Sequence, residues 1–396
     1  MKHLVSFMAC AASCLCASQA YASDLNPSMH LQEDTVAKTP TAFSRSLEEA
    51  PACTPKEGTP KVEAPFKPTV KLGGCIMTQY SITDRENLAT NGGFNVRIVR
   101  ALANGMVWKD VAYRLQLELS GAPGVDRGPR VLDAYTEWTR YKEWQPRLGQ
   151  FKRCFGFDNP IHPMMVGFGS FSQIAIKLQS IGDRIGEHVS NGRDIGFQMQ
   201  GDLLPQADGH RLLHYQVGVY NGQGTNHKDV DRHKDLIGGL WVMPTKDLRI
   251  GAFGWNGYYT DEKNPKNTLR RARYDIGFTY EGAWSARGEY AHSVGGTTKG
   301  GATESDGWYA MVGVPVPQCK DLKVYGRWDC YRDDAARWNS LVTNWGLALN
   351  YYLGKQYVLQ LNYTHSGSQF DGAWRSLQHP SFASECTLLN LSRRRA

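Results

Sequence analysis

Residues 193–224 decide the fold class, and they read RDIGFQMQGDLLPQADGHRLLHYQVGVYNGQG. Apolar Ile195 and Phe197 alternate with polar neighbours, and after a polar turn Leu213 and Tyr215 begin a second alternating run. A period of two residues indicates a strand with one apolar and one polar face. Two such runs of about ten residues predict an antiparallel hairpin that is long enough to cross a bilayer when tilted.

Similar runs recur along the chain and predict a sheet that closes on itself. Short turns such as PTKD and GKQ alternate with long loops such as GYYTDEKNPKNT. Short turns at one end and long loops at the other are typical of outer-membrane barrels, whereas a β-sandwich keeps no such parity. Besides the hairpin, the segments that we expect to be strands are 71–79, 95–103, 111–120, 131–141, 146–155, 236–244, 248–255, 271–281, 284–293, 307–316, 322–331, 344–353 and 357–365.

The cost of burying charge in lipid predicts which face of each strand points outward. In 271–281, Arg273 and Asp275 share one face, and Tyr274 and Ile276 share the other. An arginine at the lipid midplane of a barrel costs roughly 2–4 kcal/mol. We therefore expect the charged faces to line a water-filled lumen and the apolar faces to contact acyl chains.

The N-terminus has the features of an export signal. Lys2 is basic, residues 4–17 are mainly apolar or small, and Ala20-Tyr21-Ala22 is an A-x-A cleavage site. Beyond it, no apolar run approaches the roughly eighteen residues of a membrane helix, so insertion into a membrane would require a closed barrel. The expected organisation is a signal peptide (1–22), a disordered periplasmic lead-in (23–69), a transmembrane β-barrel (70–370) and an atypical C-terminal tail (371–396).

Composition and motifs argue against several functional classes. Three of the nine cysteines lie in the expected signal peptide, and the other six are scattered without a C-x-x-C pair, so neither a disulfide framework nor a zinc site follows. The formal net charge of +7 would favour anions in a lumen, and no nucleic-acid motif accompanies it. The sequence contains no G-x-S-x-G, P-loop or H-E-x-x-H motif. We therefore expect no enzyme activity, cofactor, metal or nucleic-acid partner.

Several short motifs occur in a fixed order between about residues 70 and 370. They are RLGQFK at 147–152, GRDIG at 192–196, GVYNG at 218–222, the spaced residues of RYDIGFTY at 273–280, and RGEY at 287–290. In these motifs the chain resembles the phosphate-selective porins (porin O and P type) of Gram-negative outer membranes. The resemblance implies a barrel of about sixteen strands, usually a homotrimer, that passes small anions such as phosphate through a lumen narrowed by an infolded loop.

The C-terminus departs from the pattern of that family. Segment 357–365 ends on the long-loop side, so one more strand must return and pair with the first. The chain ends in LSRRRA (391–396), a poor strand without a terminal aromatic residue. A frame-shifted or truncated tail and a short closing run near 386–391 both stay open, although an open edge in lipid would leave unpaired backbone groups.

The gap from residue 156 to residue 192 is the candidate for the infolded loop, because unstructured stretches of that length are uncommon unless functional. Arginine and lysine at a constriction can replace part of the hydration shell of an anion. The alternative is that each wall cation pairs with Glu118, Asp275, Glu289 or Asp329. The candidate pore-lining and anion-binding residues are Arg114, Lys177, Arg184, Arg271, Arg273, Arg287, Lys323 and Arg327.

These patterns together predict an all-β transmembrane barrel that acts as a porin in the outer membrane of a Gram-negative bacterium. It would be a passive diffusion channel for small hydrophilic solutes, would contact outer-membrane lipid and would prefer anions. Two alternatives remain open. One is a secreted β-sandwich that binds carbohydrate through its many Trp and Tyr residues, and the other is an outer-membrane barrel hydrolase with a Ser/His pair in its wall.

Overall fold

The computed structural model describes only part of the chain. The chain divides into two units, Met1–Ala42 and Phe43–Ala396, and every described residue belongs to the second. The expected signal peptide and nearly all of the expected lead-in lie outside the described residues. No helix in the described part is long and apolar enough to cross a membrane. The described residues are 66–85, 91–120, 128–186, 190–354, 357–370 and 373–388.

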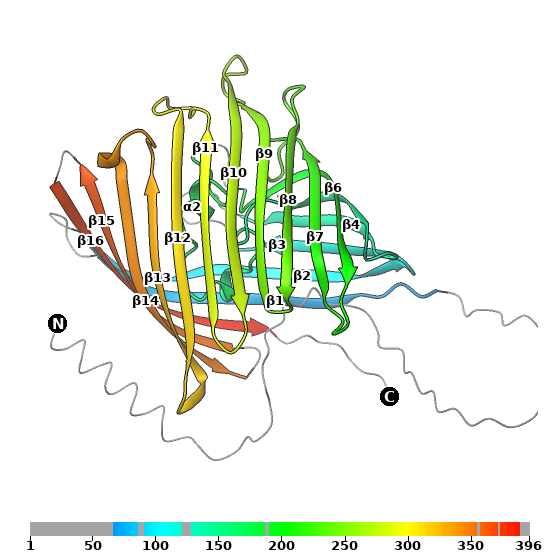
Figure 1. Ribbon diagram of the computed structural model, residues 1–396, viewed down its shortest axis with the longest axis horizontal. Coiled ribbons are helices and arrows are strands. Elements are labelled where there is room, and N and C mark those ends of the chain that lie inside the picture. The colour runs from blue at the N-terminus through cyan, green and yellow to red at the C-terminus, as the bar shows by residue number, and fades with distance from the viewer. Residues whose placement is uncertain are drawn as a thin grey trace, which may run out of the picture. The chain divides into compact units, whose positions relative to one another are not determined.

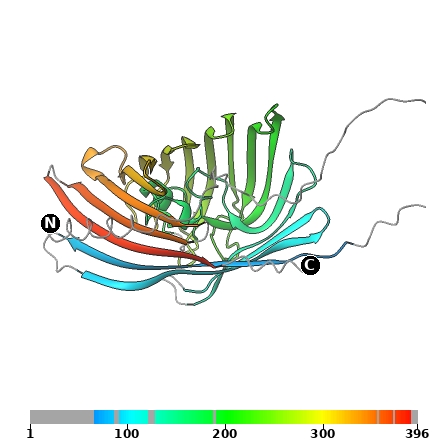
Figure 2. The ribbon, with the colours of Figure 1, turned by 90° about the horizontal axis from the view of Figure 1, so that it is seen from below.

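The strands form one closed antiparallel barrel. Each strand pairs with its neighbours in the sequence, and β1 pairs with β16 to complete the ring (Figures 1 and 2). A closed ring excludes the two-sheet sandwich. The strands are β1 (Lys71–Arg85), β2 (Asn91–Trp108), β3 (Val111–Glu118), β4 (Arg130–Trp138), β5 (Gln145–Lys152), β6 (Arg193–Pro205), β7 (Arg211–Tyr220), β8 (Asp235–Thr245), β9 (Leu248–Thr260), β10 (Thr268–Glu281), β11 (Ser285–Val294), β12 (Glu304–Val316), β13 (Cys319–Arg332), β14 (Leu341–Leu353), β15 (Tyr357–Phe370) and β16 (Ala373–Leu388).

The connections alternate in length as the sequence predicts. At one end of the barrel, residues 109–110 join β2 to β3 and residues 246–247 join β8 to β9. At the other end, residues 221–234 join β7 to β8, and residues 153–192 join β5 to β6. The longest connection, 153–192, contains the expected gap and carries most of the contacts described below.

Side-chain exposure shows the expected alternation between the two faces of a strand. In β10, Ile276 is 53 % exposed, whereas Arg271 is 1 % exposed. Tyr274 and Phe278 are exposed on the same outer face as Ile276, and Arg273 is buried inside with Arg271. The apolar faces therefore point out of the barrel and the charged faces point into it.

The C-terminal tail supplies the closing strand. The barrel continues beyond residue 370, because Ala373–Leu388 pairs along its length with β15 and also pairs with β1, from Gly74 opposite Leu388 to Arg85 opposite Leu377. The strand begins well before the short run near 386–391. Its weak period-two signal is interrupted by Pro380, and pairing on both sides satisfies its backbone groups. Residues 389–396 lie outside the described part.

Candidate functional site

The connection between β5 and β6 folds into the barrel and is called the infolded loop here (residues 153–192; Figures 1 and 2). It contains the short helices η2 (Pro163–Met165) and α2 (Gln173–Lys177). Gly192 at its end has a φ of +77°, and a Cβ there would lie 1.8 Å from Asn159 Oδ1. This bend therefore requires glycine, which adopts positive φ without strain.

Apolar side chains pack the infolded loop against much of the inner wall. Phe155 lies edge-on to Trp255 of β9, with ring centroids 5.4 Å apart. Met164 belongs to a buried cluster with Met77 of β1. A third group of buried side chains comes from the loop and from β11 to β14, and it comprises Ile161, Val166, Phe168, Ile174, Leu178, Ala291, Tyr309, Met311, Tyr325, Tyr331 and Ala348.

Asp183 of the infolded loop is bound by two of the predicted pore arginines. Arg273 donates from Nη2 to Oδ1 over 2.6 Å and from Nη1 to Oδ2 over 2.9 Å, and Arg271 Nη1 lies 3.3 Å from Oδ2. Burial alone would raise the pKa of Asp183, but the charges of Arg273 and Arg271 outweigh it and hold the pKa well below its usual range. The carboxylate therefore stays ionised and clamps the loop to β10.

The same two arginines belong to a buried cluster around Trp255. The guanidinium carbons of Arg153, Arg271 and Arg273 lie 5.0, 4.5 and 4.8 Å from the centroid of the Trp255 ring. Three positive charges beside one aromatic ring need nearby anions if they are to remain buried. Their carboxylate partners are Asp183, Asp194 and Asp235.

The first half of the infolded loop is anchored to β11. The carboxylate of Glu289 accepts the backbone N–H of Phe157 over 2.6 Å and that of Asp158 over 3.0 Å. Arg287 Nη1 lies 3.2 Å from the Asp158 carboxylate and also donates to the Val166 carbonyl. Arg287 therefore pairs with a carboxylate of the infolded loop, whereas Glu289 binds backbone N–H groups of that loop.

Residues 168–173 of the infolded loop contact side chains of β13. Arg327 donates to the Ser170 carbonyl over 2.6 Å, and its guanidinium lies 4.6 Å from the Phe168 ring centroid. Asp329 accepts the backbone N–H of Gln173 over 2.9 Å, whereas its distance to Arg327 is 3.9 Å.

The peptide groups of Gly169 reach strands near both ends of the chain. Its N–H donates to Asn362 Oδ1 of β15 over 3.0 Å. Its carbonyl accepts a hydrogen bond from Arg97 of β2. The infolded loop therefore contacts strands on both sides of the β1–β16 pairing.

The eight candidate residues fall into two groups. Arg184, Arg271, Arg273, Arg287 and Arg327 are buried and hold the infolded loop in place; Arg184 donates to the carbonyls of Gly295 and Ala302. The other three keep more contact with solvent, namely Arg114, Lys177 and Lys323. Lys177 is exposed at the end of α2 and has no ion pair with a described residue.

Sequence reasoning missed most of a group of basic residues on the wall formed by β2 to β6, which is called the cationic cluster here. Arg100 pairs with Glu118 at 2.8 Å, while Arg193 and Arg114 share Asp133 at 2.6 and 3.3 Å. Lys152 donates to the carbonyls of Asn159 and Ile161 and has no carboxylate partner among the described residues. The cluster is Arg100, Arg114, Lys152 and Arg193, with two carboxylates between them.

The electrostatic effect of the cationic cluster is visible at His162 of the infolded loop. Burial and the charges of Arg100, Lys152, Arg193 and Arg114 lower the pKa of His162 to about 3, so its imidazole is neutral at physiological pH. The signal that could have revealed the cluster is positional. Lys152 and Arg193 directly flank the long gap, within the RLGQFK and GRDIG motifs.

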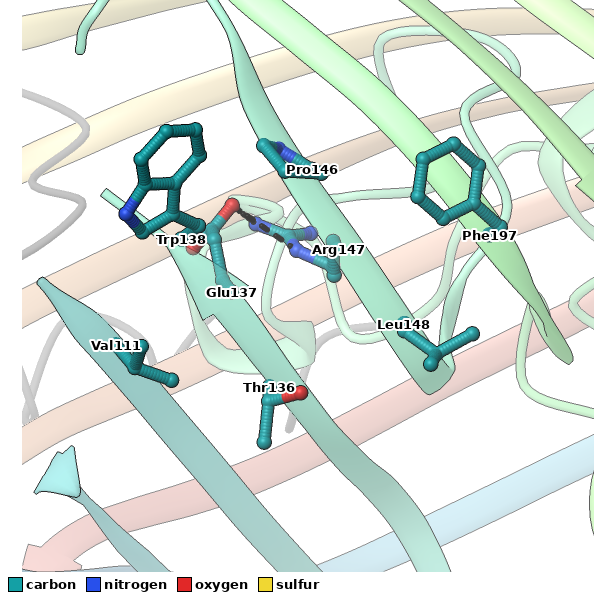
Figure 3. A pocket seen from close by; sticks show the side chains of 8 residues that line it. All are labelled: Val111, Thr136, Glu137, Trp138, Pro146, Arg147, Leu148 and Phe197. Carbon is teal, nitrogen blue, oxygen red and sulfur yellow. Dashed lines mark hydrogen bonds and ion pairs between the residues drawn. The ribbon is translucent and has the colours of Figure 1, made fainter. Parts of the chain in front are cut away.

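A hollow of about 150 Å³ lies between β3, β4, β5 and β6 and is distinct from the cationic cluster. Figure 3 shows the Glu137–Arg147 ion pair beside it, at 2.8 Å. Exposed Leu148 and Phe197 contribute to its largely apolar lining, as expected on the outer face of the barrel. Its lining residues are Val111, Thr136, Glu137, Trp138, Pro146, Arg147, Leu148 and Phe197.

Comparison with known proteins identifies the fold. No family model matches the sequence, and no curated protein matches it significantly. Among solved structures, an anion-selective porin from Comamonas acidovorans aligns over 81 % of this chain and 100 % of its own, with a TM-score of 0.61 and 12 % identity. The chain has the porin fold.

Two further structures support this conclusion. The outer-membrane channel DcaP of Acinetobacter baumannii aligns over 81 % of this chain and 97 % of its own, with a TM-score of 0.55 and 12 % identity. OmpF of Salmonella typhi aligns over the same shares, with a TM-score of 0.58 and 9 % identity. At these identities the likeness concerns the fold alone.

Proposed function

We propose that this protein is a porin of a Gram-negative outer membrane, a passive channel for small hydrophilic solutes. Three features support the proposal. The barrel has an apolar outer face that suits lipid and a charged inner face that suits water. A long loop folds into the interior and contacts the inner wall at β10, β11 and β13. Proteins of the same fold include an anion-selective porin and an outer-membrane channel.

We further propose that the channel prefers anions, and the charge of the cationic cluster carries this proposal. Its three arginines share two carboxylates, which leaves a formal excess of one positive charge before Lys152 is counted. The Arg114 side chain is 33 % exposed, so its guanidinium can meet a solute. By contrast, carboxylates of the loop and wall neutralise Arg271, Arg273 and Arg287, which therefore do not form a continuous basic track.

Phosphate is the proposed physiological anion, and a homotrimer is the proposed assembly. Two observations support the first proposal. The motifs of this chain resemble those of the phosphate-selective porins, and the cationic cluster contains arginines, whose planar guanidinium groups bind phosphate oxygens in a bidentate manner. The trimer form of OmpT, an outer-membrane protein of Vibrio cholerae with a similar fold, supports the second. The experiments below test these proposals separately.

The decisive experiment is ion selectivity in planar bilayers under a salt gradient. We expect a reversal potential on the anion side, which Arg114→Ala reduces because the variant removes a solvent-accessible charge from the cationic cluster. Arg337→Ala is the matched control, because Arg337 is 73 % exposed in the β13–β14 connection and pairs there with Asp334. A cation-sided reversal potential for the unaltered protein would reject the proposed anion preference. It would not reject the proposal that the protein is a porin.

Cell fractionation and gel mobility test the membrane assignment. We expect the protein in the outer-membrane fraction, with a band that shifts on boiling and a trimeric band after cross-linking. Added phosphate should reduce chloride current if phosphate binds in the lumen. Recovery of the chain as a detergent-free soluble protein would reject the porin assignment, and ester hydrolysis by the purified protein would favour the hydrolase.

A further inference from the structure

Two sulfur-containing side chains of β1 face two donor side chains of the infolded loop. Cys75 and Met77 are two residues apart on β1 and therefore share its inner face. His162 and Met164 are two residues apart at η2. Cys75, Met77 and Met164 lie in one buried hydrophobic cluster together with Ile98.

The spacing of the thiol and the imidazole fits a shared metal ion. Cys75 Sγ lies 3.7 Å from His162 Nε2. Bonds of about 2.3 Å to sulfur and about 2.0–2.1 Å to nitrogen place these two ligand atoms about 3.6 Å apart at a tetrahedral angle and about 3.8 Å apart at a trigonal one. The observed separation lies between those values, so little movement of either side chain is required.

The donor types determine the class of metal. One thiol, two thioethers and one imidazole make a soft set, which favours Cu(I) over oxygen-preferring ions. Among the described residues, no group of three or more His, Cys, Asp and Glu side chains could hold a metal ion. The set of ligands proposed here is of another kind, because two of its four donors are methionine sulfur atoms.

The surrounding charge favours a monovalent ion. Arg100 lies directly opposite Cys75 in the β1–β2 register, so a basic side chain already stands beside the proposed site, and a thiol loses its proton when it binds a metal ion. A thiolate with a monovalent cation is neutral overall, whereas a divalent ion would add positive charge beside the cationic cluster. We propose that Cys75, Met77, His162 and Met164 bind one monovalent soft metal ion, of the Cu(I) or Ag(I) class.

Binding through Nε2 has one structural cost. His162 Nδ1 accepts the backbone N–H of Met164 over 3.3 Å, so the ring proton now belongs on Nε2. Metal binding at Nε2 moves this proton to Nδ1 and sacrifices one long hydrogen bond. His162 is only partly buried, so its imidazole keeps some contact with solvent. The bound ion would connect the infolded loop to β1, and this inference does not depend on which solute the channel conducts.

Copper binding by the purified full chain in detergent tests the proposal. Cu(I) is supplied without oxygen in competition with the chelator bicinchoninate. We expect one ion per chain, with an affinity that Cys75→Ser lowers by about 100-fold or more and that Met77→Leu and Met164→Leu each lower by at least about tenfold. Cys330→Ser and Met199→Leu are matched controls outside the site and should bind as the unaltered protein does.

X-ray absorption by the copper-loaded, unaltered protein decides the matter if a variant fails to fold, as judged by its mobility before and after boiling. We expect sulfur neighbours at about 2.3 Å together with one nitrogen at about 2.0 Å. A spectrum without sulfur, or without the nitrogen, would overturn the proposal. Undiminished binding by a folded Cys75→Ser variant would overturn it as well.

Discussion

Replacing Asp183 by Asn should release the infolded loop from β10. The change keeps the size of the side chain and removes the charge that Arg271 and Arg273 contact. Arg271 retains Asp235 at 2.6 Å, whereas the other hydrogen-bond acceptors of Arg273 are the Leu178 carbonyl and the hydroxyl of Ser293. The variant therefore leaves a buried guanidinium without its carboxylate.

The magnitude follows from the burial of this ion pair. Removing one partner of a buried pair costs about 3–5 kcal/mol. Because each 1.4 kcal/mol corresponds to a factor of ten, the ratio of undocked to docked loop should rise by roughly two to three and a half orders of magnitude. The free energy of barrel unfolding should change less, because the strand pairing of β10 with β9 and β11 is untouched.

Hydrogen exchange of residues 153–192 and single-channel current measure this release. We expect faster amide exchange in the loop and a larger, noisier conductance. Asp208→Asn is the control, because that exposed carboxylate lies in the β6–β7 turn beside His210. The double variant Asp183→Asn with Arg273→Met should recover part of the slow exchange, because it removes the buried guanidinium that Asp183→Asn alone leaves without a carboxylate, while a side-chain oxygen stays at position 183 for Ser180 and Ile185. Unchanged amide exchange of the infolded loop in Asp183→Asn would refute the claim that Asp183 holds the loop against β10.

Three further predictions follow from the structure. The contribution of Asp183 to docking of the infolded loop should be fully present above its ordinary pKa of 3.8 and be lost as the pH falls below it, because the docked state holds that pKa lower and binds fewer protons; the difference in exchange between the unaltered protein and Asp183→Asn at several pH values measures this. Burial raises the pKa of the Cys154 thiol to about 12, so at pH 8 iodoacetamide should leave Cys154 unmodified until the barrel is denatured, whereas half-buried Cys319 reacts, as mass spectrometry would show. Deleting residues 371–396 should abolish the heat-modifiable band by leaving β1 and β15 as open edges, and a deletion variant that retains that band would contradict the assigned closure.

Much of the barrel was predictable from the sequence because strand alternation is a local property. Arg273 and Tyr274 are adjacent residues, and their opposite surroundings follow from a period of two. The closing strand was not predictable in this way. Its alternation is weak, and its position follows from the pairing that both β1 and β15 require.

The partners of the inner charges were not predictable, because they depend on the path of the infolded loop. Glu289 lies two residues from Arg287 on the same face, which favours a local ion pair. Instead, the loop brings Asp158 to Arg287 across 129 residues of sequence. Glu289 binds backbone N–H groups of that loop, which no side-chain pattern encodes.

The contacts of Gly169 join the infolded loop to the strands on either side of the β1–β16 pair. One glycine binds β2 near the start of the barrel and β15 near its end, and the bond to Asn362 spans 193 residues of sequence. The infolded loop thus bridges β2 and β15, which flank the β1–β16 pair that closes the barrel. The weakly patterned final strand pairs with β1 on one side and with β15 on the other, so its register is set by these two partners more than by its own residues.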